Sequence, residues 1–326
     1  MRLDTRLDAD LAAVPGAVRQ LADAGLAGVF TYEGPGDVFL PLGVAAATGV
    51  PLDLYSNVAI ALPRSPMHLA HLAHDLQRTT GGRFSLGLGS QVKRHVEDRY
   101  GATWESPVEQ LRECVLAVKA IQCSWATGEP LAFEGRWTRH TYCPPVFVPP
   151  PLEGPPAPVL LGAMGPRMTA MAVEVADGLL VHPFCTDRSV AELTLPQTSA
   201  APDGFRVVGQ AIVGVARDEL ELEAAAAGVR GLVAFYASTP AYRPVLDVHG
   251  WGDLQVELRD LTRAGRWAEL PGAVPQEVVD AIGIVGSPAE VAAGLRRRFG
   301  DCDRVALSLP AVPSLGTLAE LTALAA

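Results

Sequence analysis

The sequence predicts an α/β fold, a (β/α)8 TIM barrel with insertions after the fourth and the seventh strand. Two observations support this: eight apolar runs have the length of strands, and nearly all of them are followed by a helical segment. The runs are apolar on both faces, as in a parallel sheet covered by helices, and right-handed crossovers close such units into a barrel. A doubly wound open sheet is the alternative. We expect a single domain over residues 1–326.

Turn residues and helix caps mark the first four strand-helix units. Strands are expected at residues 2–6, 26–32, 52–62 and 83–88. The helices that follow them are expected at residues 11–24, 39–48, 67–79 and 107–125. Asp10 is placed to cap the first helix and Pro107 to begin the fourth, which are positions that these residue types favour. A proline-rich excursion follows at about 126–156, and a long segment of this kind is usually functional or flexible.

Four further strands complete the barrel. They are expected at residues 159–162, 178–182, 205–216 and 304–309. Helices are expected at residues 166–175, 187–195, 219–236, 288–299 and 315–325. A second, partly helical excursion at about 240–285 separates the seventh strand from the eighth.

Charge and composition narrow the function classes. With 36 acidic and 26 basic side chains the formal net charge is −10, which disfavours nucleic acid or an anionic membrane surface as a partner. Acids stand where a signal peptide has its apolar core, and no stretch approaches the ~18 apolar residues of a membrane span. The five cysteines are scattered without a CxxC pair, which indicates neither a disulfide framework nor a zinc site. We therefore expect a cytoplasmic protein.

Polar residues follow the fourth strand, at the edge where α/β barrels bind their ligands. Gly87 and Gly89 end this strand, and glycine lets a backbone approach a flat ligand closely. Ser90, Gln91 and His95 come next and supply hydrogen-bonding groups and a titratable ring. The competing interpretation is a glycine-rich turn followed by a solvated helix.

Charged candidates follow the second and third strands. Glu33 and Asp37 come after the second strand and are candidates for proton transfer, although acids in a Gly/Pro loop also serve as turn formers or helix caps. Arg64 stands between two prolines after the third strand. It is a candidate for binding an anionic substrate or for a surface ion pair.

Two clusters of like residues have ordinary explanations. Histidines recur at every third position of one expected helix: His68, His71 and His74. This spacing spreads their side chains around the helix, so it favours a polar stripe over a metal site. A basic run near the chain's end is expected on an exposed helix face: Arg296, Arg297 and Arg298.

Six segments, in chain order, resemble the bacterial-luciferase-like superfamily, and within it the actinobacterial oxidoreductases that use the deazaflavin coenzyme F420. They are DVFLPLGVAA (37–46), ALPRSPMHLA (61–70), GGRFSLGLGSQVKRH (81–95), LLGAMGPRMT (160–169), EVADGLLVHPF (174–184) and FYASTPAYRPVLDVHGWGDL (235–254). The resemblance covers nearly the whole chain. It implies a TIM barrel with the isoalloxazine-type ring at the carboxyl ends of the strands. It also implies a homodimer, for which the apolar helix residues 69–76 offer a surface that needs cover.

The resemblance also assigns the cofactor-binding residues. It places the ring against a bulge with a non-prolyl cis peptide after Asn57, formed by Ser56, Asn57 and Val58. It places the coenzyme phosphate in the loop before Pro166, formed by Gly162, Ala163, Met164 and Gly165. Backbone N–H groups at a helix N-terminus bind anions without a lysine, so an acidic chain can hold an anionic cofactor there.

These assignments combine into one expected site. The cofactor also contacts Gly89, Ser90 and Gln91. The catalytic candidates are Asp37, His95 and Glu33. The candidates for substrate binding are Arg64, Arg139 and His140. Two positions depart from the family pattern: Gly36 stands where a histidine is common, and Tyr55 stands where a glycine usually precedes the bulge.

We therefore expect an F420-dependent oxidoreductase that transfers a hydride between the deazaflavin and a small organic substrate. One alternative is an FMN-dependent luciferase-like monooxygenase that uses reduced flavin and O2. Another is a non-catalytic barrel that binds flavin or F420. The fold does not separate these alternatives.

Overall fold

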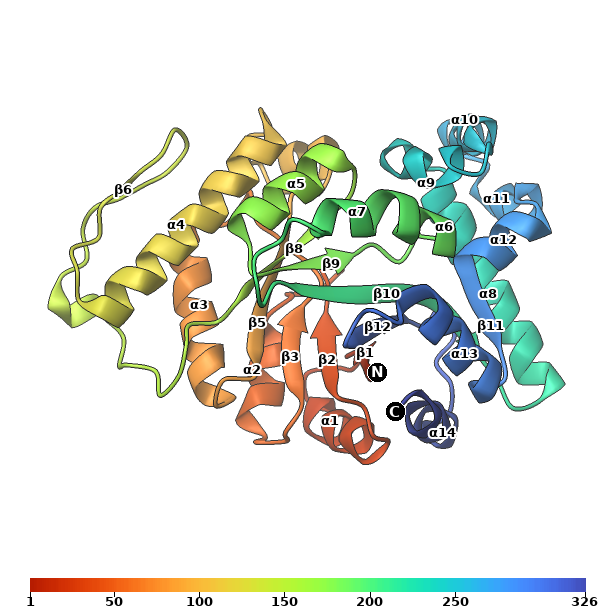
Figure 1. Ribbon diagram of the computed structural model, residues 1–326, viewed down its shortest axis with the longest axis horizontal. Coiled ribbons are helices and arrows are strands. Elements are labelled where there is room, and N and C mark those ends of the chain that lie inside the picture. Colours follow the sequence, from red (N-terminus) through yellow and green to blue (C-terminus); the bar gives the residue numbers. More distant parts are fainter.

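A closed parallel barrel forms the centre of the computed structural model, which describes residues 1–326 (Figure 1). The strands around it are β1 (Arg2–Arg6), β2 (Gly28–Thr31), β3 (Asp53–Ser56) with its continuation β4 (Ala59–Ile60), β5 (Phe84–Gly89), β8 (Val159–Ala163), β9 (Gly178–Val181), β10 (Arg206–Val215) and β12 (Arg304–Ser308). β12 pairs with both β10 and β1, which closes the barrel. The expected eight-stranded α/β barrel is confirmed.

Helices cover the outside of the barrel, and the main hydrophobic core lies between the two layers. They are α1 (Val14–Asp23), α2 (Leu40–Ala47), α3 (Pro66–Thr79), α4 (Pro107–Thr127), α5 (Pro166–Val175), α6 (Asp187–Ser189), α7 (Leu195–Thr198), α8 (Glu219–Ala237), α13 (Pro288–Phe299) and α14 (Leu315–Ala325). Four of the longer helices begin with proline, whose fixed φ suits the first helical position. None of the helices has both the length and the apolar composition to cross a membrane.

The first excursion contains a small hairpin that the sequence does not predict. Its strands are β6 (Phe133–Glu134) and β7 (Arg139–His140), and it runs along the outer side of α4 (Figure 1). The carboxylate of Glu113 on α4 accepts hydrogen bonds of 2.7 Å from three backbone N–H groups of its turn, those of Arg136, Trp137 and Thr138. Two-residue strands are too short to leave a pattern in the sequence.

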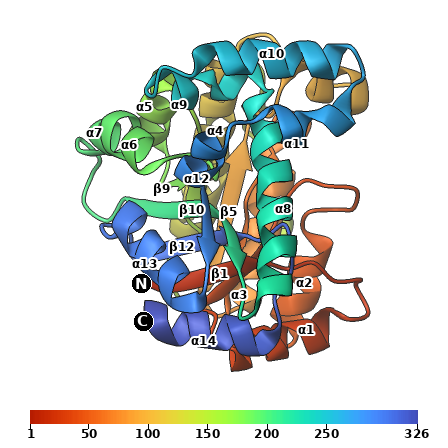
Figure 2. The same ribbon diagram turned by 90° about the vertical axis from the view of Figure 1, so that its right-hand side faces the viewer.

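The second excursion is mostly helical, as expected, but it ends in an additional strand. It comprises α9 (Arg243–Asp247), α10 (Gly252–Arg263), α11 (Leu270–Ala273), α12 (Gln276–Ile282) and β11 (Gly283–Gly286). Figure 2 shows α10 lying across the end of α8, and a second hydrophobic cluster joins the two. β11 pairs with residues 212–215 of β10, beyond the part of β10 that pairs with β9.

Two sequence expectations about helices are wrong. α1 begins at Val14 rather than at residue 11, and the side chain of Asp10 does not cap it. Arg298 is not on an exposed face: its side chain is only 1% exposed. It bonds to the Asp187 carboxylate and donates to the carbonyl oxygens of Ala281 and Ile282, because α13 turns this position inward.

Candidate functional site

The third barrel strand is interrupted by a bulge at the carboxyl end of the barrel. β3 ends at Ser56, β4 resumes at Ala59, and the peptide bond between Asn57 and Val58 is cis, as the resemblance implies. Residues 55–59 of this strand span the same ladder length as residues 85–88 of β5, so the bulge contains one extra residue. The Ser56 hydroxyl replaces the lost backbone pairing, because it donates to Gly87 O at 2.7 Å and accepts from Gly87 N at 3.0 Å.

Val58 forms a smooth apolar surface with two glycines on the neighbouring strands. A Cβ atom at Gly89 would lie 2.7 Å from Val58 Cγ2, and one at Gly162 would lie 2.9 Å from Val58 Cγ1. Each glycine therefore leaves the space that a Val58 methyl group fills. We call Val58, Gly89 and Gly162 the glycine shelf.

A row of polar side chains crosses the mouth of the barrel beside the glycine shelf. Asn57 Nδ2 donates to Gln210 Oε1 at 3.1 Å, and Gln210 Nε2 donates to Ser308 Oγ at 2.9 Å. The row links the bulge to β10 and β12. It fixes the orientation of the Asn57 amide, since buried polar groups are held by their hydrogen bonds.

The loop of residues 162–165 opens on a small pocket at the start of α5. Gly165 has φ +80°, and no side chain caps the helix. The pocket has a volume of about 80 Å³, and polar groups from several elements face it: His182, Ser189, Thr194, Gln197 and Thr169. The Oε1 atom of Gln197 is buried without a hydrogen-bond partner. Uncapped N–H groups at a helix start attract anions, so this pocket suits a phosphate-sized group.

His182 follows β9 and lines the same pocket. Its ring stacks on Tyr242 at 4.2 Å between centroids and meets the edge of Tyr236 at 4.8 Å. Burial lowers the pKa of His182 to about 3, so the imidazole is neutral. Because Nδ1 accepts a hydrogen bond of 3.1 Å from the backbone N–H of Phe184, the proton is carried by Nε2, which can donate.

Glu33 is held by four hydrogen bonds. Its carboxylate accepts from Ile60 N at 2.9 Å, from both terminal nitrogens of Arg64 at 2.7 and 3.0 Å, and from the Tyr100 hydroxyl at 3.1 Å. The Glu33 side chain is only 6% exposed. Arg64 also donates to Ile60 O at 2.7 Å. The pair ties the loop after β2 to the end of β4, and it leaves little of Arg64 for a ligand.

Asp37 and His95 are exposed. Asp37 Oδ1 accepts from Phe39 N at 2.7 Å and from Leu40 N at 2.9 Å, so it supports the start of α2. His95 begins a π-helical turn, His95–Arg99. Arg99 donates to Gly34 O at 2.7 Å, and this contact brings the turn of His95 and the loop of Asp37 to the same rim of the barrel.

The remaining predicted site residues lie in two places, at the rim after β5 and on the hairpin outside α4. Gln91, at the rim after β5, has φ 61°, and its Oε1 accepts from Val92 N, while the hydroxyl of its neighbour Ser90 donates to Gln91 O. Arg139 and His140 lie on β7, outside α4, where Arg139 pairs with Glu134. The structure does not bring these two residues together with the rest of the site.

Tyr55 does not intrude on the glycine shelf. Its ring lies in the cluster inside the barrel, and its hydroxyl donates to Asp4 Oδ2 at 2.9 Å. Two histidines of α3 make contacts within the chain: His71 lies 4.5 Å from the ring of Trp125, and His74 bonds to Pro150 O at 2.8 Å.

Sequence reasoning missed several residues at the mouth of the barrel. They are His182, Gln210, Tyr236, Tyr242 and Ser308. A signal for two of them is present: His182 and Ser308 are single polar residues at the carboxyl ends of apolar strands. The tyrosines come from the second excursion and the helix before it, and both lie in the segment 235–254 that carries part of the family resemblance.

Comparisons with known proteins show the family of the chain. The model of the luciferase-like monooxygenase family matches residues 2–301. An uncharacterized protein of Mycobacterium tuberculosis, Rv1360, is 38% identical over 313 residues, which cover 94% of this chain and 92% of that protein. A putative coenzyme F420-dependent oxidoreductase of the same organism, Rv3520c, is 28% identical over 81% of both chains.

Two solved structures share the fold. The coenzyme F420-dependent tetrahydromethanopterin reductase of Methanopyrus kandleri superposes with a TM-score of 0.76 at 19% identity, covering 98% of this chain and 96% of that one. The oxygenating constituent of 3,6-diketocamphane monooxygenase of Pseudomonas putida, in complex with FMN, has a TM-score of 0.66 at 15% identity, covering 99% and 97%. At these identities the likeness shows the fold alone.

Proposed function

Since the chain belongs to the luciferase-like monooxygenase family, whose enzymes are flavin- or F420-dependent oxidoreductases, we propose that its cofactor is coenzyme F420. The reaction is a hydride transfer between F420 and a small organic substrate. One similarity supports F420: a relative matched over 81% of the chain carries this cofactor in its name.

The observation that carries the proposal is the glycine shelf beside the pocket at the start of α5. A planar ring can lie against Val58 where this side chain packs on Gly89 and Gly162, and a phosphate can bind the small pocket at the helix start. The bound cofactor would supply the hydride chemistry. The residues proposed to hold its ring are Ser56, Asn57, Val58, Gly89, Ser90 and Gln91. Those proposed to hold its phosphate are Gly162, Ala163, Met164 and Gly165.

Around the cofactor, the chain's own residues orient the substrate and move protons. His182 is neutral with its proton on Nε2, so it is suited to donate a hydrogen bond to a substrate oxygen. Asp37 and His95 lie at the wet rim and are the proposed groups for proton exchange with solvent. Glu33 and Arg64 are bonded to each other, and their proposed role is to position the two loops.

Two substitutions of Gly165, one charged and one neutral, test whether the cofactor phosphate binds at this loop. Gly165→Asp places a carboxylate beside the phosphate, whereas Gly165→Asn imposes the same backbone strain at φ +80° without the charge. We expect Gly165→Asp to weaken F420 binding at least ~10-fold more than Gly165→Asn does, as followed by cofactor fluorescence. Equal effects of the two substitutions would show that the phosphate does not bind at this loop.

FMN is the alternative cofactor, because the same fold binds FMN in the diketocamphane enzyme. An FMN-dependent monooxygenase would use reduced flavin and O2. Turnover that consumes O2 with reduced FMN, and not with reduced F420, would favour it.

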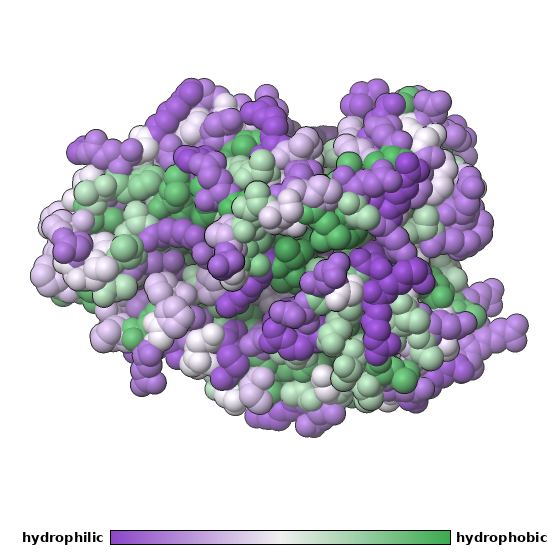
Figure 3. Space-filling view, in the orientation of Figure 1, coloured by the Kyte–Doolittle hydropathy of each residue, from purple (hydrophilic) through white to green (hydrophobic).

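We also propose a homodimer, though not through residues 69–76. That face of α3 is covered within the chain, where His74 and Gln77 bond to the carbonyl oxygens of Pro150 and Pro155. Apolar side chains gather instead over α4 and beside it, at the left of Figure 3. The first excursion also exposes Tyr142, Val146, Phe147 and Val148. Light scattering that gives a monomer of about 34.3 kDa at all concentrations would contradict the dimer.

A further inference from the structure

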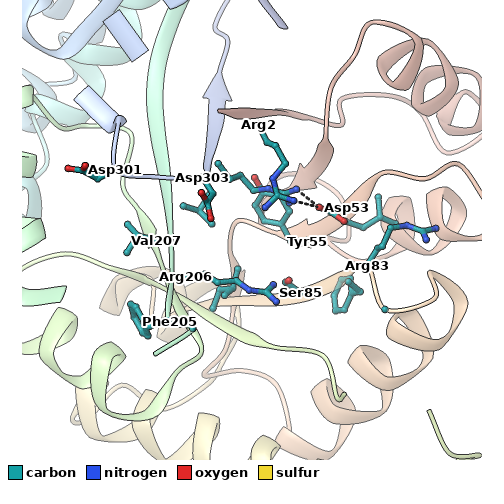
Figure 4. Close-up of a pocket in the computed structure, with 17 residues that line it drawn as sticks. Arg2, Asp53, Tyr55, Arg83, Ser85, Phe205, Arg206, Val207, Asp301 and Asp303 are labelled. Atoms are coloured by element: carbon teal, nitrogen blue, oxygen red, sulfur yellow. Dashed lines mark hydrogen bonds and ion pairs between the residues drawn. The ribbon is translucent and has the colours of Figure 1, made fainter. Parts of the chain in front are cut away.

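A second cavity lies at the end of the barrel opposite the glycine shelf. Its volume is about 580 Å³, and it opens where the strands begin (Figure 4). The first residues of three strands line it, Arg2 of β1, Arg206 of β10 and Arg304 of β12, and Arg83 precedes β5. The glycine shelf lies at the carboxyl ends of the strands, so the two sites are separate.

Four guanidinium groups gather around this cavity in a chain of net charge −10. Two of them are paired: Arg304 contacts Asp4 at 3.3 Å and also bonds to Asp53, and Arg2 lies 3.7 Å from the same Asp53 carboxylate. Arg83 and Arg206 have no carboxylate within 4.0 Å. Neither of these two arginines is therefore neutralised by a direct ion pair.

The unpaired arginines are placed to receive a ligand. The Nε atom of Arg83 is buried, whereas its two terminal nitrogens have no hydrogen-bond partner within the chain and are free to meet a ligand. Arg206 extends across the cavity toward Ser85 (Figure 4). The acids Asp301 and Asp303 also line the cavity, and the Asp301 side chain points away from the other labelled residues.

The inner wall of the cavity is apolar. Leu160 and Val208 belong to the cluster inside the barrel, and Phe84 and Phe205 complete the wall. A ligand that matches both the arginines and the apolar wall has carboxylate or phosphate groups that bind the arginines and a hydrocarbon part that packs against the wall. We propose that this cavity binds a small organic polyanion, a polycarboxylate or a phosphate ester, through Arg83 and Arg206.

Thermal unfolding with citrate and with inorganic diphosphate, against chloride at equal ionic strength, tests the proposal. A ligand that binds only the folded protein raises the midpoint, and we expect a rise of about 2 °C or more at ~10 mM. The rise should be lost in the double variant Arg83→Gln and Arg206→Gln. A rise with citrate alone identifies a polycarboxylate, and a rise with diphosphate alone identifies a phosphate ester.

Two control variants locate the effect. Arg94→Gln removes an exposed arginine at the other end of the barrel and should respond as the wild type does. Gly165→Asp blocks the anion loop at the carboxyl ends, so a rise that survives it does not come from that loop. The proposal is overturned if neither anion raises the midpoint, if the double variant responds as the wild type does, or if Gly165→Asp abolishes the rise. Calorimetric titration with citrate and with diphosphate gives the same comparison without heating.

Discussion

The side chain of Val58 occupies the space into which a side chain at Gly89 would have to project, because a Cβ there would lie 2.7 Å from Val58 Cγ2. We therefore expect Gly89→Ala to destabilise the protein by about 2 kcal/mol, the usual cost of overpacking. Val58→Ala removes the opposing methyl groups, so the double variant should be less destabilised than the sum of the single variants by about 1 kcal/mol. Urea unfolding measures all three.

Gly36→Ala is the matched control, since a Cβ at Gly36 meets nothing within 4 Å. It should change the free energy of unfolding by less than about 0.5 kcal/mol. Additive effects of Gly89→Ala and Val58→Ala would contradict the close contact at the glycine shelf.

The second prediction concerns the carboxylate of Glu33. Glu33→Gln keeps the shape but removes the charge that faces Arg64, whose side chain is 21% exposed. We expect a loss of about 2 kcal/mol in the free energy of unfolding, because an arginine is left without its partner. Glu97→Gln breaks the exposed pair with Lys93 and should cost less than about 0.5 kcal/mol. If both substitutions cost the same, the Glu33–Arg64 pair does not stabilise the loops as described.

The third prediction is a pH dependence caused by Asp4. Burial raises the pKa of this carboxyl from 3.8 to about 6, despite the opposing effect of Arg304. The folded state therefore holds the proton more tightly than the unfolded state, and the stability that Asp4 contributes is full below about pH 4 and is lost as the pH rises through about 6.

Asp4→Asn should remove this dependence. We expect the variant to match the wild type near pH 4 and to exceed it by about 2 kcal/mol near pH 8, as measured by urea unfolding. A variant that is less stable than the wild type near pH 8 would mean that the ion pair of Asp4 with Arg304 outweighs the cost of burying the charge.

The fourth prediction concerns His182, whose pKa is lowered to about 3 by burial. The unfolded state binds the proton more readily, so the wild type should lose stability as the pH falls below about 6.5. His182→Asn keeps an acceptor for Phe184 N–H but removes the Nε2 donor. Relative to this variant, the wild type should lose about 2 kcal/mol between pH 7 and about pH 4.5.

The same variant separates stability from catalysis. At pH 7, we expect His182→Asn to fold normally and to lower kcat by about 100-fold, because its shorter amide places no donor where Nε2 meets the substrate. Steady-state kinetics on an identified substrate measures this, and near-full activity would exclude His182 from substrate contact.

Much of the barrel follows from local signals in the sequence. The bounds of α5, α13 and α14 are as expected, because a proline or a serine cap marks where each begins. β11 has only four residues, of which the first and the last are glycines, and it follows directly on α12, so nothing in the sequence separates it from the helical excursion. The apolar run at 52–62 likewise hides the break between β3 and β4, which only the family resemblance indicated.

The site was less predictable because it depends on contacts between distant segments. Arg298 looks like part of an exposed basic run, yet the fold turns it toward Asp187, more than a hundred residues away in the chain. The polar row of Asn57, Gln210 and Ser308 joins three strands in the same way. Such contacts join residues that are far apart in the sequence, so they can be identified only in the folded barrel.

The central claim is that the glycine shelf and the phosphate loop hold F420, and a direct titration of the purified protein with F420 and with FMN tests it most directly. Fluorescence of each cofactor gives the dissociation constant. We expect micromolar or tighter binding of F420 and at least ~10-fold weaker binding of FMN. Equal or tighter binding of FMN would contradict the claim.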